Sequence, residues 1–218
     1  MSGRIEVISD AICPWCFIGK RQMERALPIL AAEGLRFSVH WRPFQLNPEM
    51  PAAGVERAAY RAAKFGARAP QLDAKIAAAG RAVGLEFRHD LMQRTPNTVD
   101  AHRLAWRAEA EGCQDAVVER MFRAYFTEGR DIGDHAVLAE LGAECGMDRD
   151  RTLAYLAGLD GRAEILAADQ AARTAGLDGV PAFALDGHIL FTGAVPADAF
   201  AEAVREAHRV LTIPHRAA

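Results

Sequence analysis

The chain has 218 residues, of which half are hydrophobic and a quarter are charged, a composition that is ordinary for a globular protein. Its formal net charge is −3 and its Lys and Arg residues form no basic block, so the sequence predicts no nucleic-acid partner. It contains no run of about 18 apolar residues and therefore predicts no membrane partner. Residues 1–6 lack the basic start and apolar stretch of a signal peptide, and we expect a cytoplasmic protein.

The first predicted elements are a strand and a helix that flank a pair of cysteines. Residues 4–9 read RIEVIS, and their β-branched side chains predict a short strand. The sequence CPWC follows at residues 13–16, and its proline suits the first turn of a helix, where the missing N–H has no helical partner. Small and apolar residues then recur every three or four positions, which predicts an amphipathic helix that ends near Gly34 and has Lys20 on a polar face. Pro28 lies inside this helix and predicts a kink or early fraying.

A second strand and a long helical block come next. Phe37, Val39 and Trp41 alternate with other residues, which predicts a strand that Pro43 closes. Over residues 48–176 the hydrophobic period changes, and helical patterns dominate. The predicted helices cover residues 56–65, 70–83, 98–111, 115–126, 134–145, 149–157 and 162–175.

The strand pattern returns near the C-terminus. Residues 182–185 and 188–191 flank Asp186-Gly187, a dipeptide typical of tight β-hairpins. Residues 197–210 then predict a closing helix. The predicted order is therefore strand, helix, strand, helical block, hairpin and helix, which is an α/β arrangement.

The CPWC pair has three interpretations: half of a metal site, a structural disulfide or a reactive dithiol. A structural zinc site usually needs four Cys or His ligands in two close pairs, whereas Cys113 and Cys145 stand far apart and no histidine pair has a suitable spacing. The sequence therefore argues against a metal site at the CPWC pair. A permanent disulfide is rare in a reducing cytosol. We expect Cys113 and Cys145 to be small buried apolar groups rather than a second redox pair.

The reactive dithiol explains more of the pattern. Cys13 comes just before a helix N-terminus, where unpaired N–H groups and the positive end of the helix dipole favour a thiolate. The thiolate is the species that attacks a disulfide. Cys16 lies one helical turn further on, close enough to form a ring with Cys13. We expect Cys16 to be the more buried of the two and to stay protonated to higher pH.

A second motif, Gly179-Val180-Pro181, comes directly before the first apolar strand of the hairpin. A cis bond is far commoner before proline than before any other residue. On composition alone, however, a trans proline at the start of an edge strand is the commoner arrangement. The residues by themselves therefore favour the trans form.

Five segments spread over nearly the whole chain carry a family resemblance. They read DAICPWCFIGKRQME (residues 10–24), WRPFQLNPEMP (41–51), PNTVDAHRLAW (96–106), FRAYFTEGRDIGD (122–134) and GVPAFALDG (179–187). In combination they resemble the DsbA-like branch of the thioredoxin superfamily, and more narrowly the FrnE-type thiol oxidoreductases.

The resemblance implies a thioredoxin fold with a large all-helical insertion between its βαβ half and its ββα half. Residues 1–47 and 177–218 are then expected to form the discontinuous thioredoxin-like domain, and residues 48–176 the inserted helical domain. It also implies that Pro181 is cis and lies beside the CPWC segment.

The resemblance further implies a thiol–disulfide oxidoreductase or isomerase that acts on protein or small-molecule disulfides through its dithiol. In that mechanism Cys13 attacks, Cys16 resolves the mixed disulfide, and Pro181 positions the substrate beside the sulfurs. The expected substrate contacts are Pro14, Trp15 and Val180. The expected partner is a disulfide-containing protein or a small thiol; no cofactor is expected, and glutathione is a candidate co-substrate.

Two other functions stay open. The related class of hydroxychromene-carboxylate isomerases and kappa-class glutathione transferases shares the architecture and often the WRPF and PN segments. That class usually has Ser at the position of Cys13 and lacks the second cysteine, so a glutathione-dependent isomerase or transferase is the alternative function. A binding or chaperone module that uses an apolar cleft is the third hypothesis.

Four further residues have two interpretations each. His102 and Trp106 share one face of the predicted helix 98–111, where they either pack or line a cleft between the insertion and the thioredoxin domain. Arg42 is either solvated or a contact for a glutathione carboxylate. Asp10, just before the CPWC segment, either assists proton transfer or stabilises a turn.

An apolar stripe on the predicted helix 115–126 predicts what kind of surface the insertion presents to the CPWC segment. Val118, Met121, Phe122, Tyr125 and Phe126 form either a core face or an apolar rim for substrate. Because no basic cluster accompanies the stripe, we expect the insertion to cap the CPWC face and to leave an apolar cleft there rather than a charged one.

Overall fold

A four-stranded mixed sheet lies at the centre of the protein, which a computed structural model describes over residues 1–212. Its strands are β1 (Gly3–Ser9), β2 (Phe37–Pro43), β5 (Ala182–Leu185) and β6 (His188–Thr192), in the order β2-β1-β5-β6. β1 runs parallel to β2 and antiparallel to β5, which pairs with β6 as a hairpin. The predicted strands and the hairpin are therefore confirmed.

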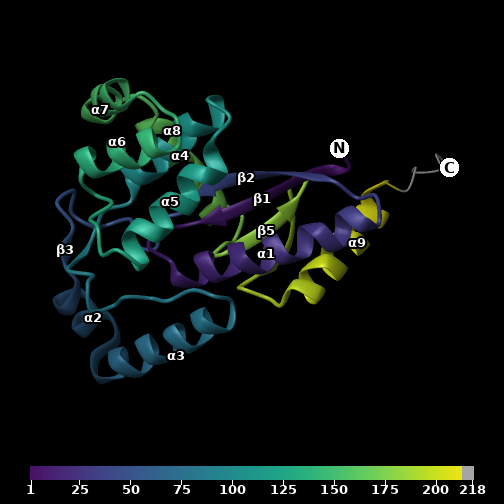
Figure 1. Cartoon of the computed structure of the whole chain (residues 1–218), viewed down its shortest axis with the longest axis horizontal. Coiled ribbons are helices and arrows are strands. Elements are labelled where there is room, and N and C mark those ends of the chain that lie inside the picture. The colour runs from purple at the N-terminus through teal and green to yellow at the C-terminus, as the bar shows by residue number, and fades with distance from the viewer. Residues whose placement is uncertain (213–218) are drawn as a thin grey trace.

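Two helices pack on one face of this sheet and against each other, α1 (Pro14–Ala32) and α9 (Ala197–Thr212) (Figure 1). Phe183 of β5 meets Phe200 of α9 edge to face, with ring centroids 4.9 Å apart. α1 continues through Pro28 to Ala32, so the helix does not end early at its internal proline.

The helical block follows β2. It contains α2 (Arg57–Phe65), a 3₁₀ turn η1 (Gly66–Arg68), α3 (Ala69–Ala82), α4 (Val99–Ala110), α5 (Gln114–Phe126), α6 (His135–Glu144), α7 (Arg149–Ala157) and α8 (Arg162–Thr174). Each predicted helix is present within one or two residues of its expected ends. The sequence did not predict the two short strands β3 (Val55–Glu56) and β4 (Arg94–Thr95), which pair antiparallel. Two-residue strands are too short to produce a hydrophobic period.

The sheet is covered on its second face as well. Ile8, Phe44 and Ala182 form a buried cluster against Ala172 of α8 and Leu177 beyond it. The larger core cluster on the other face includes residues of both α1 and α5. The structure is thus an α/β thioredoxin fold with a helical insertion, as the resemblance implied. The division into separate domains at residues 47 and 177 stays a prediction.

No helix within residues 1–212 combines the length and the apolar content that crossing a membrane requires.

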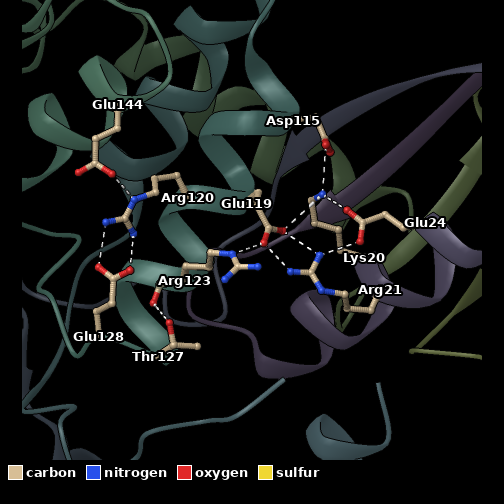
Figure 2. A network of polar contacts seen from close by, with 10 residues as sticks. All are labelled: Lys20, Arg21, Glu24, Asp115, Glu119, Arg120, Arg123, Thr127, Glu128 and Glu144. Carbon is tan, nitrogen blue, oxygen red and sulfur yellow. Dashed lines mark hydrogen bonds and ion pairs between the residues drawn. The ribbon is translucent and has the colours of Figure 1, made fainter. Parts of the chain in front are cut away.

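α1 is fastened to α5 by stacked rings and by a buried lysine. Phe17 stacks on Phe122 with ring centroids 5.0 Å apart. One turn after Cys16, the side chain of Lys20 is 1% exposed, although the sequence placed it on a polar face. Its Nζ lies 3.1 Å from Asp115 Oδ2 and also pairs with Glu119 and Glu24 (Figure 2). Lys20 is therefore a cation enclosed between the two helices.

The pKa of Lys20 depends on two opposing effects, burial of the ammonium group and attraction by the neighbouring carboxylates. Burial lowers the pKa of its ammonium group, but the carboxylates of Asp115, Glu24 and Glu119 outweigh burial, and the net shift is upward. The ion cluster therefore keeps Lys20 charged inside the α1–α5 contact.

Replacing Lys20 with Ala removes this cation from the three carboxylates, of which Glu24 and Glu119 still pair with Arg21. The partners keep part of their hydration, so we expect a loss of about 1–3 kcal/mol in the free energy of unfolding, measured by urea denaturation. The matched control is Arg209→Ala, which breaks an exposed ion pair with Glu206 and should leave the stability unchanged. A Lys20→Ala protein as stable as wild type would contradict the assigned role of the cluster.

Candidate active site

The CPWC segment forms the junction between β1 and α1. Cys13 is the N-cap of α1 with an extended backbone, and Pro14 occupies the first helical turn. The N–H of Cys16 donates to the carbonyl of Cys13 at 3.0 Å, which fixes the two cysteines one turn apart. Cys13 is 3% exposed, and Cys16 is fully buried. Both cysteines are free thiols in the structure.

The second wall of the site comes from the start of β5. Because β1 pairs with β5 with Ile8 opposite Ala182, the residues after β1 lie beside the residues before β5. The Val180–Pro181 peptide bond is cis. The Cys13 Sγ donates a hydrogen bond to the carbonyl oxygen of Val180 at 3.4 Å. These observations confirm the expectation that Pro181 is cis and lies next to Cys13.

Gly19 allows α1 to approach this wall closely. A Cβ atom placed on Gly19 would lie 3.2 Å from Pro181 Cγ and 3.2 Å from Phe183 Cζ. Pro181 and Phe183 are both buried, so neither has free space into which to move. The missing side chain at Gly19 therefore sets the distance between the cysteine helix and the proline.

The buried thiol of Cys16 has a perturbed acidity. Burial raises the pKa of Cys16 well above its ordinary value, and the neighbouring Cys13 raises it further. The Ser9 side chain and the Asp10 backbone lower the pKa of Cys16 but do not cancel these effects. The prediction that Cys16 is the more buried cysteine is confirmed, and the raised pKa of its thiol agrees with the expectation that it keeps its proton to higher pH.

A narrow pocket of about 50 Å³ opens beside the CPWC segment. The sequence suggested an apolar cleft here, but the pocket has charged side chains in its lining. Ile12 and Pro14 form one wall, but Arg57, Arg61 and Asp73 also line the pocket. Both arginines pair with the single carboxylate of Asp73, at 3.1 Å and 2.6 Å. The expectation of an uncharged cleft is therefore wrong.

The pocket is charged because the apolar stripe of α5 packs in the core and does not form most of the pocket wall. The stripe of Val118, Met121, Phe122, Tyr125 and Phe126 is buried, and most of its surface packs in the core against α1. The pocket wall opposite Pro14 comes instead from α2 and α3, which contribute charged side chains. Tyr125 and Phe126 reach this pocket only with part of their surface.

A second cavity contains the histidine and tryptophan that the sequence placed on one helix face. His102 and Trp106 of α4 line it together with Ser9 and Arg42. Arg42 is held by Glu109 at 2.9 Å and is also paired with Glu6, so its charge is already compensated. This pairing does not support Arg42 as a glutathione contact.

Within residues 1–212, no group of three or more His, Cys, Asp or Glu side chains is arranged to hold a metal ion.

A family model for the DSBA-like thioredoxin domain matches residues 4–205 of the chain. The cysteine pair at a helix start beside a proline, described above, lies within this match. The chain belongs to this family.

Three solved structures show how far the similarity of this DSBA-like protein extends. A probable DsbA oxidoreductase from Streptomyces coelicolor is 29% identical, with 99% of this chain and 94% of that chain covered and a TM-score of 0.86. The cytosolic disulfide reductase DsbM from Pseudomonas aeruginosa, also solved with GSH, is 23% identical, with 95% and 99% covered and a TM-score of 0.66. A 2-hydroxychromene-2-carboxylate isomerase is 14% identical, with 95% and 96% covered and a TM-score of 0.68. The last two share the fold with this chain.

Sequence reasoning missed Ser9, Arg57 and Arg61 near the cysteines. The two-residue period of β1 places Ser9 on the same face as Ile5 and Val7, which could have identified it. Arg57 and Arg61 lie four residues apart and therefore on one face of α2, but nothing in their spacing indicates that this face lies opposite Pro14.

The raised pKa of Cys16 predicts how stability depends on pH. A thiol in the unfolded chain ionises near pH 8.5, whereas folded Cys16 keeps its proton to higher pH. Its contribution is therefore fully present below pH ~8.5 and is lost above it, at up to about 1.4 kcal/mol per pH unit. The measurement is urea denaturation of the reduced protein between about pH 7.5 and 9.5.

Cys16→Ala is the control for this prediction, because it keeps the other three thiols. We expect the wild type to lose stability over this range more steeply than the variant does. Equal slopes would show that burial of Cys16 does not perturb its ionisation.

Proposed function

We propose that the protein is a thiol–disulfide oxidoreductase that acts on protein or small-molecule disulfides through Cys13 and Cys16. The observation that carries the proposal is the contact of Cys13 Sγ with the Val180 carbonyl, with the Cys16 thiol buried one helical turn behind. This arrangement supports Cys13 as the attacking sulfur, Cys16 as the resolving sulfur and the Val180 carbonyl as a backbone acceptor for substrate.

The proposed reaction uses the two thiols in sequence. The Cys13 thiolate attacks one sulfur of a substrate disulfide, the substrate S–S bond breaks, and the departing sulfur takes up a proton. Cys16 then loses its proton and attacks Cys13 Sγ, which forms the Cys13–Cys16 disulfide and releases the second substrate thiol. The substrate is reduced by two electrons and the dithiol is oxidised by two.

The other expected site residues have places that suit substrate contact. Pro14, Trp15 and Val180 are partly exposed around the nearly buried Cys13. When Cys13 is a thiolate it no longer donates to the Val180 carbonyl, which can then accept a backbone N–H of the substrate. Pro181 is buried and acts by holding that carbonyl in place.

Glutathione enters the proposal as a co-substrate. The pocket beside Pro14 has two arginines for one aspartate, an excess of positive charge that suits a substrate carboxylate. The similarity in fold to DsbM, which was solved with GSH, is consistent with this proposal. A glutathione-dependent isomerase needs no second thiol, so the buried Cys16 favours the redox function over that alternative.

The direction of electron flow follows from the compartment. We propose a cytoplasmic location, which the similarity in fold to the cytosolic disulfide reductase DsbM supports. The cytosolic glutathione couple lies at about −220 to −320 mV, so a moderately oxidising dithiol stays reduced there. Under these conditions the protein reduces or isomerises disulfides rather than forming them.

Two single substitutions test the proposed roles. Cys13→Ser should abolish exchange with an oxidised substrate, since no attacking sulfur remains. Cys16→Ser should trap a mixed disulfide on Cys13, because the resolving thiol is gone. Mass spectrometry of both variants after exposure to an oxidised peptide measures the adducts and their positions.

Three outcomes would contradict the assignment. An adduct that forms on Cys16 of the Cys13→Ser variant at least as fast would reverse the roles of the two cysteines. Turnover that needs glutathione and survives the loss of Cys16 would favour the isomerase, and client binding indifferent to both cysteines would favour a binding module.

A further inference from the structure

Gly19 is buried in the second turn of α1, where this helix packs against the start of β5. Glycine is less favourable than alanine inside a helix, so its presence here calls for a reason. A Cβ atom at this position would lie 3.2 Å from both Pro181 Cγ and Phe183 Cζ. Carbon atoms in van der Waals contact are usually about 3.5–4.0 Å apart. A side chain at Gly19 would therefore force one of its neighbours to move.

The ring of Phe183 has no room to yield. It is 1% exposed and lies between two other aromatic rings. Its centroid is 4.9 Å from that of Phe200 and 5.1 Å from that of Phe191. Because protein interiors are closely packed, a displacement of this ring would disturb the whole aromatic cluster.

α1 is also prevented from moving away from β5. On its side toward α5, Phe17 stacks on Phe122 with ring centroids 5.0 Å apart. Lys20, the residue after Gly19, is held by Asp115 at 3.1 Å and by two further carboxylates (Figure 2). The helix is therefore fixed between α5 and the sheet, and Gly19 lies at the contact with β5.

The segment of Pro181 and Val180 is the neighbour that can shift. It connects the end of α8 to the first residue of β5, and Val180 is partly exposed. The carbonyl of Pro181 accepts a hydrogen bond from the N–H of Gly193 at 2.7 Å, which holds the segment from the side of β6. A displacement of Pro181 would also move the adjoining carbonyl of Val180, which lies 3.4 Å from Cys13 Sγ.

We propose that Gly19 is a positioning residue that keeps the Val180 carbonyl where the backbone of a bound peptide can pair with it. By this means Gly19 favours disulfides in peptides over small disulfides that have no backbone N–H. The proposal rests on the dithiol function proposed above. Gly19 touches neither the substrate nor the sulfurs, and it acts through its contact with Pro181.

Two kinds of disulfide separate this role from a general effect on the dithiol. A peptide disulfide needs both the Cys13 sulfur and a correctly placed Val180 carbonyl, because a hydrogen bond weakens steeply when its distance and angle change. Dithiobis-nitrobenzoate is an aromatic disulfide without any N–H group, and it needs the sulfur alone. The ratio of the two rate constants therefore reports the position of the carbonyl.

The experiment uses the full chain with Cys113→Ala and Cys145→Ala, so that only the dithiol reacts. The peptide substrate consists of two short peptides joined through one cysteine each, with a fluorophore on one and a quencher on the other. Stopped-flow fluorescence follows the cleavage of this peptide disulfide by the reduced protein. Stopped-flow absorbance follows the coloured thiol that the aromatic disulfide releases.

We expect Gly19→Ala to lower the rate constant for the peptide disulfide about tenfold, since small displacements of a positioning group have large effects on rate. The rate constant for the aromatic disulfide should stay within about twofold of the parent protein. Equal losses with both disulfides would assign Gly19 a purely structural role and overturn the proposal. An unchanged rate with the peptide disulfide would overturn it as well.

Gly142→Ala is the matched control, because Gly142 is also a buried glycine inside a helix, α6. A Cβ atom there would lie 3.3 Å from Met147 Sδ and 3.5 Å from Leu104 Cδ1. The methionine side chain is flexible and can yield, so neither rate constant should change.

A second pair of variants keeps the test decisive if Gly19→Ala does not fold. Phe183→Leu removes the Cζ contact, and Gly19→Ala is then compared with Gly19 in that background, where the contact with Pro181 remains. The same selective loss with the peptide disulfide is expected, and its absence would overturn the proposal. A parent protein that cleaves neither disulfide would instead refute the dithiol function itself.

Discussion

The site depends on the antiparallel pairing of β1 with β5. Cys13 and Val180 are 167 residues apart in sequence, and they meet because Ile8 pairs with Ala182. The pairing is stabilised by side chains on both faces of the sheet, including Phe183 on one and Ala182 with Phe44 on the other. A shift of one residue in this register would exchange the two faces and separate the thiol from the Val180 carbonyl.

α1 connects the paired strands β1 and β5 to the helical insertion. Its first turn contains the cysteines, its middle packs on Pro181 at Gly19, and its opposite side meets α5 through Phe17 and Lys20. The helical insertion is therefore in direct contact with the helix that presents the sulfurs. Residues of the insertion line the pocket beside Pro14, and His102 of α4 lines a second cavity together with Ser9 of β1. The insertion thus lies against both the first turn of α1 and the end of β1.

Local patterns were enough to predict most elements, because helices and strands of five or more residues have a measurable hydrophobic period. Asp134 and Asp148, for example, are N-caps whose side chains accept from the backbone of the following turn, a role that aspartate commonly has directly before a helix. The CPWC segment was recognisable for the same reason, since its chemistry depends on residues close in sequence. Residues at the site that come from distant segments had no local pattern, and Arg57 is the clearest case.

Lys20 shows why burial of a polar residue is difficult to predict. In the sequence it belongs to the charged face of an amphipathic helix, and only the presence of α5 turns that face inward. The conformation of Pro181 is a similar case, because composition favours trans and the family resemblance alone implied cis. The burial of Lys20 and the cis bond of Pro181 were difficult to predict for the same reason. The environment of each residue is set by partners that are remote in sequence.

The unequal surroundings of the two thiols have a consequence for the kind of exchange that the site favours. Cys13 is held at the helix end beside a partly exposed surface, whereas Cys16 is enclosed and has a raised pKa. A resolving thiol that holds its proton attacks more slowly than an exposed one, because only the thiolate is nucleophilic. In the function proposed above, the mixed disulfide on Cys13 would then live longer, which would give a second thiol of the substrate time to attack it. Under that proposal, the burial of Cys16 favours rearrangement of the substrate's disulfides over simple reduction.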